Sequence, residues 1–213
     1  GMANIPGVVG DVNLVKTRQN LEDVYQYRGL LTEDGELDPD VYRDVNESKL
    51  ITNYAAGWAR MALAYRQIGD IDNAIECIER AIKIAPDYDP IVGGYGGMLL
   101  EAGRVEEARE FYLNRVQTHS RDPRTYIGLG FAARKADNWE EAVEWYLQGL
   151  RAVPEAKELM ALLYESYAHM KRYDEAENIL VQWLQAHPTD QSARSVLEDL
   201  RRQKAAARQT PNP

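Results

Sequence analysis

The chain has 213 residues, of which 25 are Lys or Arg and 34 are Asp or Glu, so its formal net charge is −9. With 45% hydrophobic and 28% charged residues, its composition is that of a globular protein rather than a disordered or fibrous one. The acidic balance argues against nucleic-acid binding, which needs Lys and Arg to neutralise phosphates, and no apolar run approaches the roughly 18 residues of a membrane-spanning helix.

Residues 1–45 are predicted to form an irregular extension with one short helix near residues 20–27. Turn-forming pairs interrupt it at Pro6-Gly7, Asp34-Gly35 and Asp38-Pro39. Its first residues lack the basic and apolar regions of a signal peptide, and Gly1 before Met2 resembles the remnant of a cleaved tag. Acidic residues crowd one stretch in a spacing that does not fit an EF-hand loop, which favours a solvated acidic turn over a calcium site: Glu33, Asp34, Glu36, Asp38, Asp40 and Asp44.

A helix is predicted to begin near Asn46, where Asp44 and Glu47 are arranged like a capping box, and to continue into an internal repeat. The repeat has a period of 34 residues, which is the spacing of Ala74, Ala108, Ala142 and Ala176. Larger apolar residues keep the same period at Met61, Tyr95, Leu129 and Leu163, and at Ile78, Tyr112, Tyr146 and Leu180. Prolines follow it at Pro86, Pro154 and Pro188, with Ser120 at the missing position. Self-similarity at a fixed period indicates a repeat architecture.

Each period contains the patterns of two helices separated by a turn. In the first period, four apolar residues lie on one face of the first helix: Trp58, Met61, Ala62 and Tyr65. A break at Gly69-Asp70 precedes a second helix that carries Ala74, Ile78, Ala81 and Ile82. Acidic residues open the second helix of every period, where they complement the helix dipole: Asp72, Glu106-Glu107, Glu140-Glu141 and Asp174-Glu175. Asp89-Pro90 and Asp122-Pro123 predict the starts of two first helices.

This pattern resembles the tetratricopeptide repeat, whose signature is matched in the first unit by Trp58, Ala62, Tyr65, Ala74, Ala81 and Pro86. The resemblance covers four units at residues 55–88, 89–122, 123–156 and 157–190, within a region 46–190 that includes the leading helix. The sequence departs from the signature at Arg115, Trp183, Tyr164 and Ser120, which suggests altered helix contacts in units two and four. The resemblance implies an all-α, right-handed superhelical solenoid of four helix pairs, with an N-terminal extension and a C-terminal capping helix.

The predicted capping helix spans residues 191–206. Its apolar residues recur at i, i+3, i+4 and i+7, at Ala193, Val196, Leu197 and Leu200, while Arg194, Arg201 and Arg202 are expected to face water. From Lys204 onward the sequence offers nothing to bury, and residues 207–213 are predicted to be a disordered tail.

Residues 16–58 carry a second resemblance, to the segment that precedes the soluble tail of bacterial multi-pass membrane proteins of the protein O-mannosyltransferase-like class. The residues that carry it are Tyr25-Gln26-Tyr27-Arg28-Gly29-Leu30, Asp38-Pro39-Asp40-Val41-Tyr42 and Asn53-Tyr54. This resemblance implies that the chain is the water-soluble end of a larger envelope protein. Met2 argues the other way, for a free-standing chain.

No arrangement of residues predicts catalysis, a metal or a cofactor. His119, His169 and His187 lie near helix ends without a second ligand at helical spacing. Cys77, as the only cysteine, excludes an intrachain disulfide and fits a small buried side chain better than a nucleophile. The run Gly93-Gly94-Tyr95-Gly96-Gly97 is no phosphate loop, because its place in the repeat puts it inside a helix.

Tetratricopeptide arrays bind partners with the concave face of their first helices, so the resemblance implies a partner-binding groove here. By position in the repeat it is lined by Leu63, Arg66, Gly93, Gly97, Arg124, Ile127, Phe131, Arg134 and Glu165. Its arginines suit an acidic peptide, or else pair with local acids. Gly93 and Gly97 either make room for neighbouring side chains or admit another backbone. The carboxylate clamp of chaperone-binding members is not expected, since its positions hold Ala59, Leu63 and Gly94, and only Arg124 is compatible.

The sequence therefore predicts a non-catalytic module that binds a protein or peptide, with no nucleic acid and no membrane insertion by this chain itself. An alternative is a soluble C-terminal accessory domain of a membrane-embedded glycosyltransferase-like protein. In a third hypothesis, residues 3–45 occupy the groove and the module is structural. The compartment stays open between the cytoplasm, for a free-standing chain, and the cell envelope, for a tethered tail.

Overall fold

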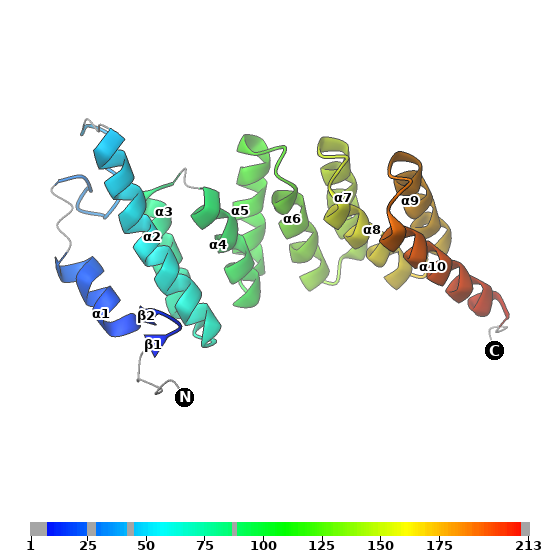
Figure 1. Ribbon diagram of the computed structural model, residues 1–213, viewed down its shortest axis with the longest axis horizontal. Coiled ribbons are helices and arrows are strands. Elements are labelled where there is room, and N and C mark those ends of the chain that lie inside the picture. The colour runs from blue at the N-terminus through cyan, green and yellow to red at the C-terminus, as the bar shows by residue number, and fades with distance from the viewer. Residues whose placement is uncertain (1–7, 25–28, 42–44, 87–88, 210–213) are drawn as a thin grey trace. The chain divides into compact units, whose positions relative to one another are not determined.

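The computed structural model describes residues 8–24, 29–41, 45–86 and 89–209, and Figure 1 labels its elements in chain order. It opens with an antiparallel hairpin of β1 (Val8–Val9) and β2 (Val12–Asn13), in which Val9 pairs with Val12. Helix α1 (Leu14–Gln19) continues into a π-helical turn, η1 (Asn20–Val24). The short helix thus begins six residues earlier than predicted, because the Asn13 side chain accepts a hydrogen bond from the Lys16 backbone N–H at 3.0 Å and caps it.

Nine helices follow in the described part of the chain, and eight of them form four pairs joined by short turns. The pairs are α2 (Val45–Gln67) with α3 (Ile71–Ile84), α4 (Asp89–Glu101) with α5 (Val105–Thr118), α6 (Pro123–Lys135) with α7 (Trp139–Ala152), and α8 (Lys157–His169) with α9 (Tyr173–Ala186). The ninth is α10 (Gln191–Gln209). The predicted all-α class with four repeat helix pairs is confirmed. Asp44 and the side chains of Glu47 and Asp89, with the capping roles predicted for them, lie outside the described residues.

Each turn between the helices of a pair passes through the left-handed region of the backbone at the same repeat position. Glycine occupies that position in the first two pairs, at Gly69 (φ 81°) and Gly103 (φ 76°). In the last two pairs Asp137 (φ 57°) and Lys171 (φ 59°) adopt the same conformation, although side chains other than glycine's pay about 1–2 kcal/mol for it. The turn is therefore a property of the repeat rather than of glycine alone.

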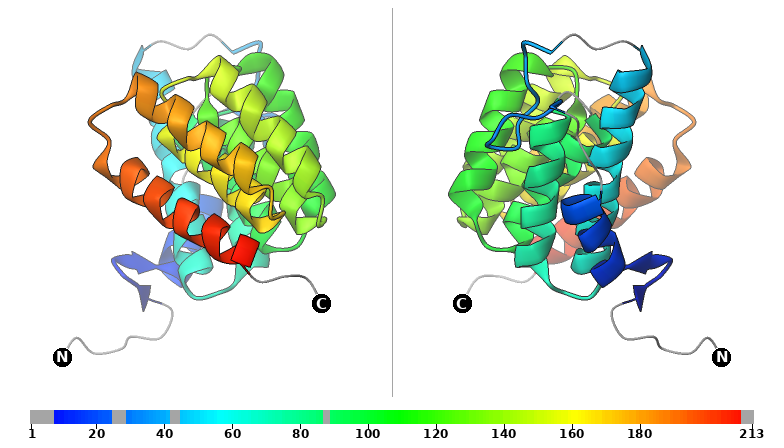
Figure 2. Two further views of the ribbon diagram at one scale, coloured as in Figure 1. Left: turned by 90° about the vertical axis from the view of Figure 1, so that its right-hand side faces the viewer. Right: turned by 90° about the vertical axis from the view of Figure 1, so that its left-hand side faces the viewer.

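The chain divides into two compact units, residues 1–107 and 108–213, which are described separately. In the first unit the N-terminal extension packs against α2 and α3, as the right-hand view of Figure 2 shows. Leu21 lies against Gly57, and the Arg18 and Arg80 guanidinium groups each pair with both Glu22 and Glu76 at 2.6–3.0 Å. The extension thereby covers Trp58 and the apolar side of this helix pair.

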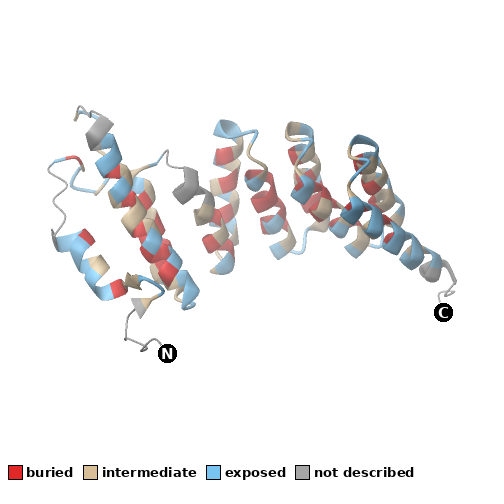
Figure 3. Cartoon of the chain, in the orientation of Figure 1, coloured by how far each residue is buried: buried red, intermediate tan, exposed pale blue. Residues whose placement is uncertain are grey.

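The second unit has a continuous core contributed by α6 to α10. Figure 3 shows the buried residues of α6 as an almost unbroken band. Two glycines of α6 allow aromatic rings of the preceding and following helices to reach its backbone: Tyr112 lies over Gly128, and Tyr146 over Gly130. A Cβ at either glycine would collide with the ring, so close packing explains both residues.

The departures from the repeat signature at Arg115 and Trp183 have one structural explanation. The buried Arg115 side chain pairs with Asp122 at 3.3 Å, and the Trp183 indole N–H donates to Asp190 at 2.9 Å, in each case seven residues further on. Each aspartate also caps the following helix, Asp122 through the Arg124 backbone N–H at 3.0 Å and Asp190 through that of Ala193 at 3.1 Å. The bulky residue and the capping acid therefore occur together in units two and four.

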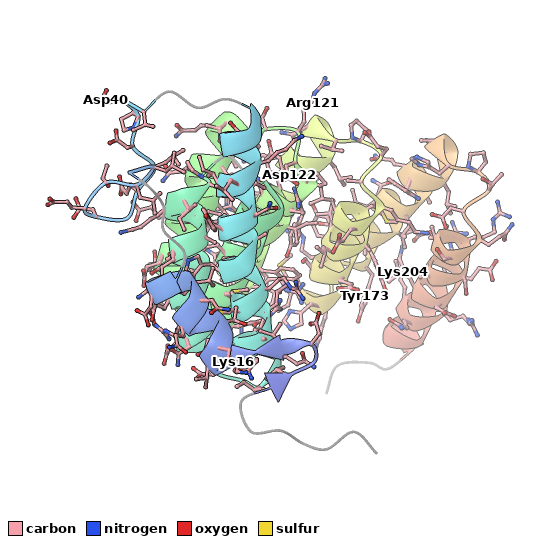
Figure 4. All side chains as sticks on the ribbon, turned by 60° about the vertical axis from the view of Figure 1, so that its left-hand side comes forward. Lys16, Asp40, Arg121, Asp122, Tyr173 and Lys204 are labelled. Carbon is pink, nitrogen blue, oxygen red and sulfur yellow. The ribbon has the colours of Figure 1, made fainter. Side chains whose placement is uncertain are left out.

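Helix α10 closes the second unit with Ala193, Leu197 and Leu200 buried, as the pattern predicts. It continues to Gln209, three residues past the predicted end, and Lys204 is not part of a free tail. Its ammonium group contacts Asp174 at 2.5 Å and Glu177 at 2.6 Å, both on α9. Figure 4 labels Lys204 on α10. These ion pairs, which the apolar pattern could not reveal, hold the helix against α9.

Candidate partner-binding face

In the first unit, the predicted groove residues remain uncovered by the described part of the extension. Leu63 is 57% exposed, and a Cβ added at Gly97 would meet no atom within 4 Å. Arg66 forms a two-pronged ion pair with Glu101, so this arginine is paired locally. The surroundings of Gly93 lie outside the described side chains.

In the second unit, some of the predicted groove residues of α6 and α8 are buried or paired, and others are exposed. Arg124 is held by the capping residue Asp122 at 2.9 Å, and Ile127, only 7% exposed, belongs to the core because α6 packs against α8. Ile127 can therefore contribute only to the buried floor of the predicted groove. Phe131 is 36% exposed and Glu165 is exposed. We call Phe131, Arg134 and Glu165 the α6–α8 face.

The Arg134 guanidinium lies between aromatic rings rather than beside a carboxylate. Its central carbon is 5.4 Å from the centre of the Phe131 ring and 4.6 Å from that of Trp139, and it forms no ion pair with any described residue. Trp139 in turn stacks on His169 of α8 at 3.7 Å, and its indole N–H donates to Asp137 at 3.0 Å. Arg134 is thus held in place by cation–π contacts, and no carboxylate of the described residues pairs with it.

Tyr146 of α7 is fully buried and packs against α6 behind this face. Its ring passes over Gly130, one helical turn before Arg134, and the Arg134 guanidinium is a hydrogen-bond neighbour of its hydroxyl. Burial raises the pKa of the hydroxyl, the Arg134 guanidinium lowers it, and the Glu165 carboxylate raises it. The only sequence signal was Gly130, whose missing side chain makes room for the ring.

The cysteine and two of the histidines singled out in the sequence are packed against other side chains. Cys77 is fully buried, and burial raises its pKa to about 11, which confirms it as an inert core side chain. His169 and His187 stack on Trp139 and Trp183. No group of His, Cys, Asp and Glu in the described part of the chain could hold a metal ion, and none of its helices combines the length and apolarity needed to cross a bilayer.

The N-terminal extension leaves a cavity of about 530 Å³ where it meets α2 and α3. Its apolar walls include Leu21, Leu31, Trp58 and Ile84, and the Arg80 guanidinium lies 4.7 Å from the centre of the Trp58 ring. The extension therefore contacts the first helix pair on a side different from the exposed Leu63. In this unit the described residues of the extension cover one side of the helix pair and leave Leu63 exposed.

Comparison with known proteins agrees with the repeat. The tetratricopeptide repeat family model matches residues 55–88, which is the first predicted unit. The chain is 28% identical over 99 residues to protein FlbA of Caulobacter vibrioides and 31% identical over 91 residues to mouse tetratricopeptide repeat protein 17. These matches cover 46% and 42% of this chain but only 17% and 8% of those proteins, so the chain spans a small part of the relatives' length.

Solved structures show the same fold. A double mutant of MamA RS-1 superposes with a TM-score of 0.53 at 18% identity, over 69% of this chain and 83% of that one. The repeat protein TTC0263 of Thermus thermophilus gives a TM-score of 0.52 at 24% identity, over 68% and 80% of the two chains. The chain is therefore a tetratricopeptide repeat solenoid by fold, with a recognised repeat at residues 55–88.

Proposed function

We propose that this chain is a non-catalytic binding module that holds a segment of a partner protein on the α6–α8 face. A single observation supports this proposal most: Phe131 is exposed beside Arg134 and Glu165, two charges that form no ion pair with any described residue. Aromatic and arginine side chains carry much of the binding energy at protein interfaces, so an exposed phenylalanine beside an arginine without an ion pair fits a binding site. Arg66 and Arg124, which pair with Glu101 and Asp122, contribute less.

The test begins by selecting peptides from a displayed random library on the full-length chain and measuring their dissociation constants by fluorescence anisotropy. The double variant Phe131→Ala/Arg134→Glu should weaken binding about 30-fold or more while leaving the circular dichroism spectrum unchanged. Arg151→Glu is the matched control, because it reverses the same charge at an exposed position of α7. Equal affinity of the double variant and the wild type would refute the assignment of this face.

A second candidate function rests on the resemblance of residues 16–58 to the segment before the soluble tail of O-mannosyltransferase-like membrane proteins. In that case the chain is an accessory domain that positions a membrane-embedded enzyme or its protein substrate. An antibody raised against this chain, applied to fractionated native cells, decides the matter. A soluble band near 24.2 kDa contradicts the accessory role, and a much larger band in the membrane fraction supports it.

A further inference from the structure

The cavity between the N-terminal extension and the first helix pair has the size and the walls of a small-molecule site. Its volume of about 530 Å³ lies within the range of ligand pockets in proteins, roughly 300–1,000 Å³. Leu21 and Trp58 form part of its buried apolar wall. Leu31 is only partly buried, and Glu33 and Asp34, which also line the cavity, are exposed. The cavity is therefore open to solvent beside the turn that carries these two acidic residues.

Hydrogen bonds hold this acidic turn in place beside α3. The Thr32 backbone N–H donates to the Glu36 carbonyl at 2.8 Å, and that of Gly35 donates to the Thr32 carbonyl at 3.0 Å. The Leu37 backbone N–H donates to the Lys83 carbonyl at 3.3 Å, which ties the turn to the last residues of α3 (Figure 2). The backbone that carries the acidic side chains therefore has a fixed place at the cavity.

The charged groups around the cavity differ in number and in pairing. Five carboxylates and two cationic groups line it. The carboxylates of Glu22 and Glu76 pair with the Arg80 guanidinium, at 2.6 and 2.9 Å. Glu33 and Asp34, in contrast, make no ion pair with any described residue. The charge available to a ligand is therefore mainly negative, and it lies at the open side of the cavity.

We propose that this cavity binds a small organic amine, with its apolar body against Leu21, Leu31 and Trp58 and its ammonium group toward Glu33 and Asp34. An ammonium group offers only hydrogen-bond donors, which the two carboxylates accept, and the apolar body gains free energy by leaving water. A carboxylate on the same apolar body would be repelled by the acidic turn. The site belongs to the first compact unit, so this inference is independent of the α6–α8 face.

The first measurement compares three probes that share one apolar body: 2-phenylethylamine, 2-phenylethanol and 3-phenylpropionate. The full-length chain with isotope-labelled methyl groups is titrated with each probe, and NMR follows the methyl resonances of Leu21, Leu31 and Ile84. The amine should cause saturable shifts, with a dissociation constant in the millimolar range for so small a ligand. The alcohol should bind at least about 3-fold more weakly, and the carboxylate should not saturate. Equal affinity for amine and alcohol, saturable binding of the carboxylate, or no saturable shift with the amine would overturn the inference.

Charge variants test the role of the acidic turn. Glu33→Gln/Asp34→Asn should weaken amine binding about 3- to 10-fold, because it removes both partners of the ammonium group. Glu36→Gln/Asp40→Asn is the matched control, since it removes two exposed charges from the same segment that do not line the cavity. Lys83→Gln should strengthen amine binding about 2- to 3-fold, because the Lys83 ammonium group lines the cavity and repels a second cation. Equal affinities of the wild type and Glu33→Gln/Asp34→Asn, or weaker binding by Lys83→Gln, would contradict the proposal.

A variant that fills the cavity tests where the amine binds. Leu31→Trp adds a ring at a lining position and should abolish amine binding, whereas Val15→Trp adds the same ring at an exposed position of α1 and should leave binding unchanged. The methyl signals of Leu14, which is buried outside the cavity, report whether the extension stays packed against α2. If those signals are retained and Leu31→Trp binds the amine as tightly as the wild type, the cavity is not the site. If they are lost, the charge variants, which leave the apolar wall intact, decide the matter.

Discussion

The carboxylates of Asp122 and Asp190, which lie two repeat periods apart, each make three kinds of contact. Both cap a helix, both accept a hydrogen bond from the bulky residue seven positions earlier, and both pair with a cation. Although burial acts to raise it, hydrogen bonds from Arg124 and Arg115 lower the pKa of Asp122. Those from Lys157, Trp183 and the Ala193 backbone lower the pKa of Asp190. The capping acid therefore links consecutive repeats in both places.

Because the folded-state pKa of Asp122 is lowered, the ionised form stabilises the protein above the unfolded pKa of roughly 4, and this stabilisation is lost as the pH falls. Asp122→Asn keeps the capping oxygen but removes the charge. We expect it to lower the free energy of unfolding in urea by about 1–3 kcal/mol at pH 7, because the buried Arg115 loses its charged partner. The difference from the wild type should shrink between about pH 5 and pH 2. A constant difference across that range would contradict the ionic explanation.

Glycine residues within the helices of the repeat have two different kinds of surroundings. Gly130 in α6 is packed against the Tyr146 ring, whereas Gly97 in α4 borders open space. Gly130→Ala should destabilise the protein by about 1–3 kcal/mol through overpacking. Gly97→Ala should stabilise it by about 1 kcal/mol, because alanine is the better helix former. Chemical denaturation of the two variants measures both values, and the opposite order would show that the packing differs.

Gly97→Ala also separates the two interpretations of the glycines on the predicted groove. If Gly97 admits the backbone of a partner, the alanine variant binds selected peptides more weakly in spite of its greater stability. If binding and stability both improve, the glycine has no role in recognition. Anisotropy titrations with the peptides described above decide between these outcomes.

The 34-residue periodicity was sufficient to predict the helix pairs, since every pair repeats the same apolar positions and the same turn. The β1–β2 hairpin and the early start of α1 were missed, because the extension has no repeat and its cap, Asn13, is a single polar residue. The burial of Ile127 and of Tyr146 depends on how α6, α7 and α8 pack together. No pattern within one helix contains that information.

The N-terminal extension belongs to the first compact unit and stabilises it from one side. Its residues Leu14, Leu21 and Leu30 are buried in the core. Two ion pairs, Arg18–Glu76 and Arg80–Glu22, join the extension to α3. Deleting residues 1–41 should therefore lower the thermal midpoint by roughly 5–10 °C. Affinity for peptides bound at the α6–α8 face should not change. A gain in affinity would instead support the hypothesis that the extension occupies the binding surface.

The central claim is that recognition takes place on the first helices of the second unit. Isotope-labelled full-length chain, titrated with a selected peptide and followed by backbone amide NMR, tests it most directly. We predict that the largest shift changes fall within residues 127–135 of α6 and 161–169 of α8, around Phe131, Arg134 and Glu165. Changes confined to α7, α9 or the N-terminal extension would contradict the claim and move the binding site elsewhere on the molecule.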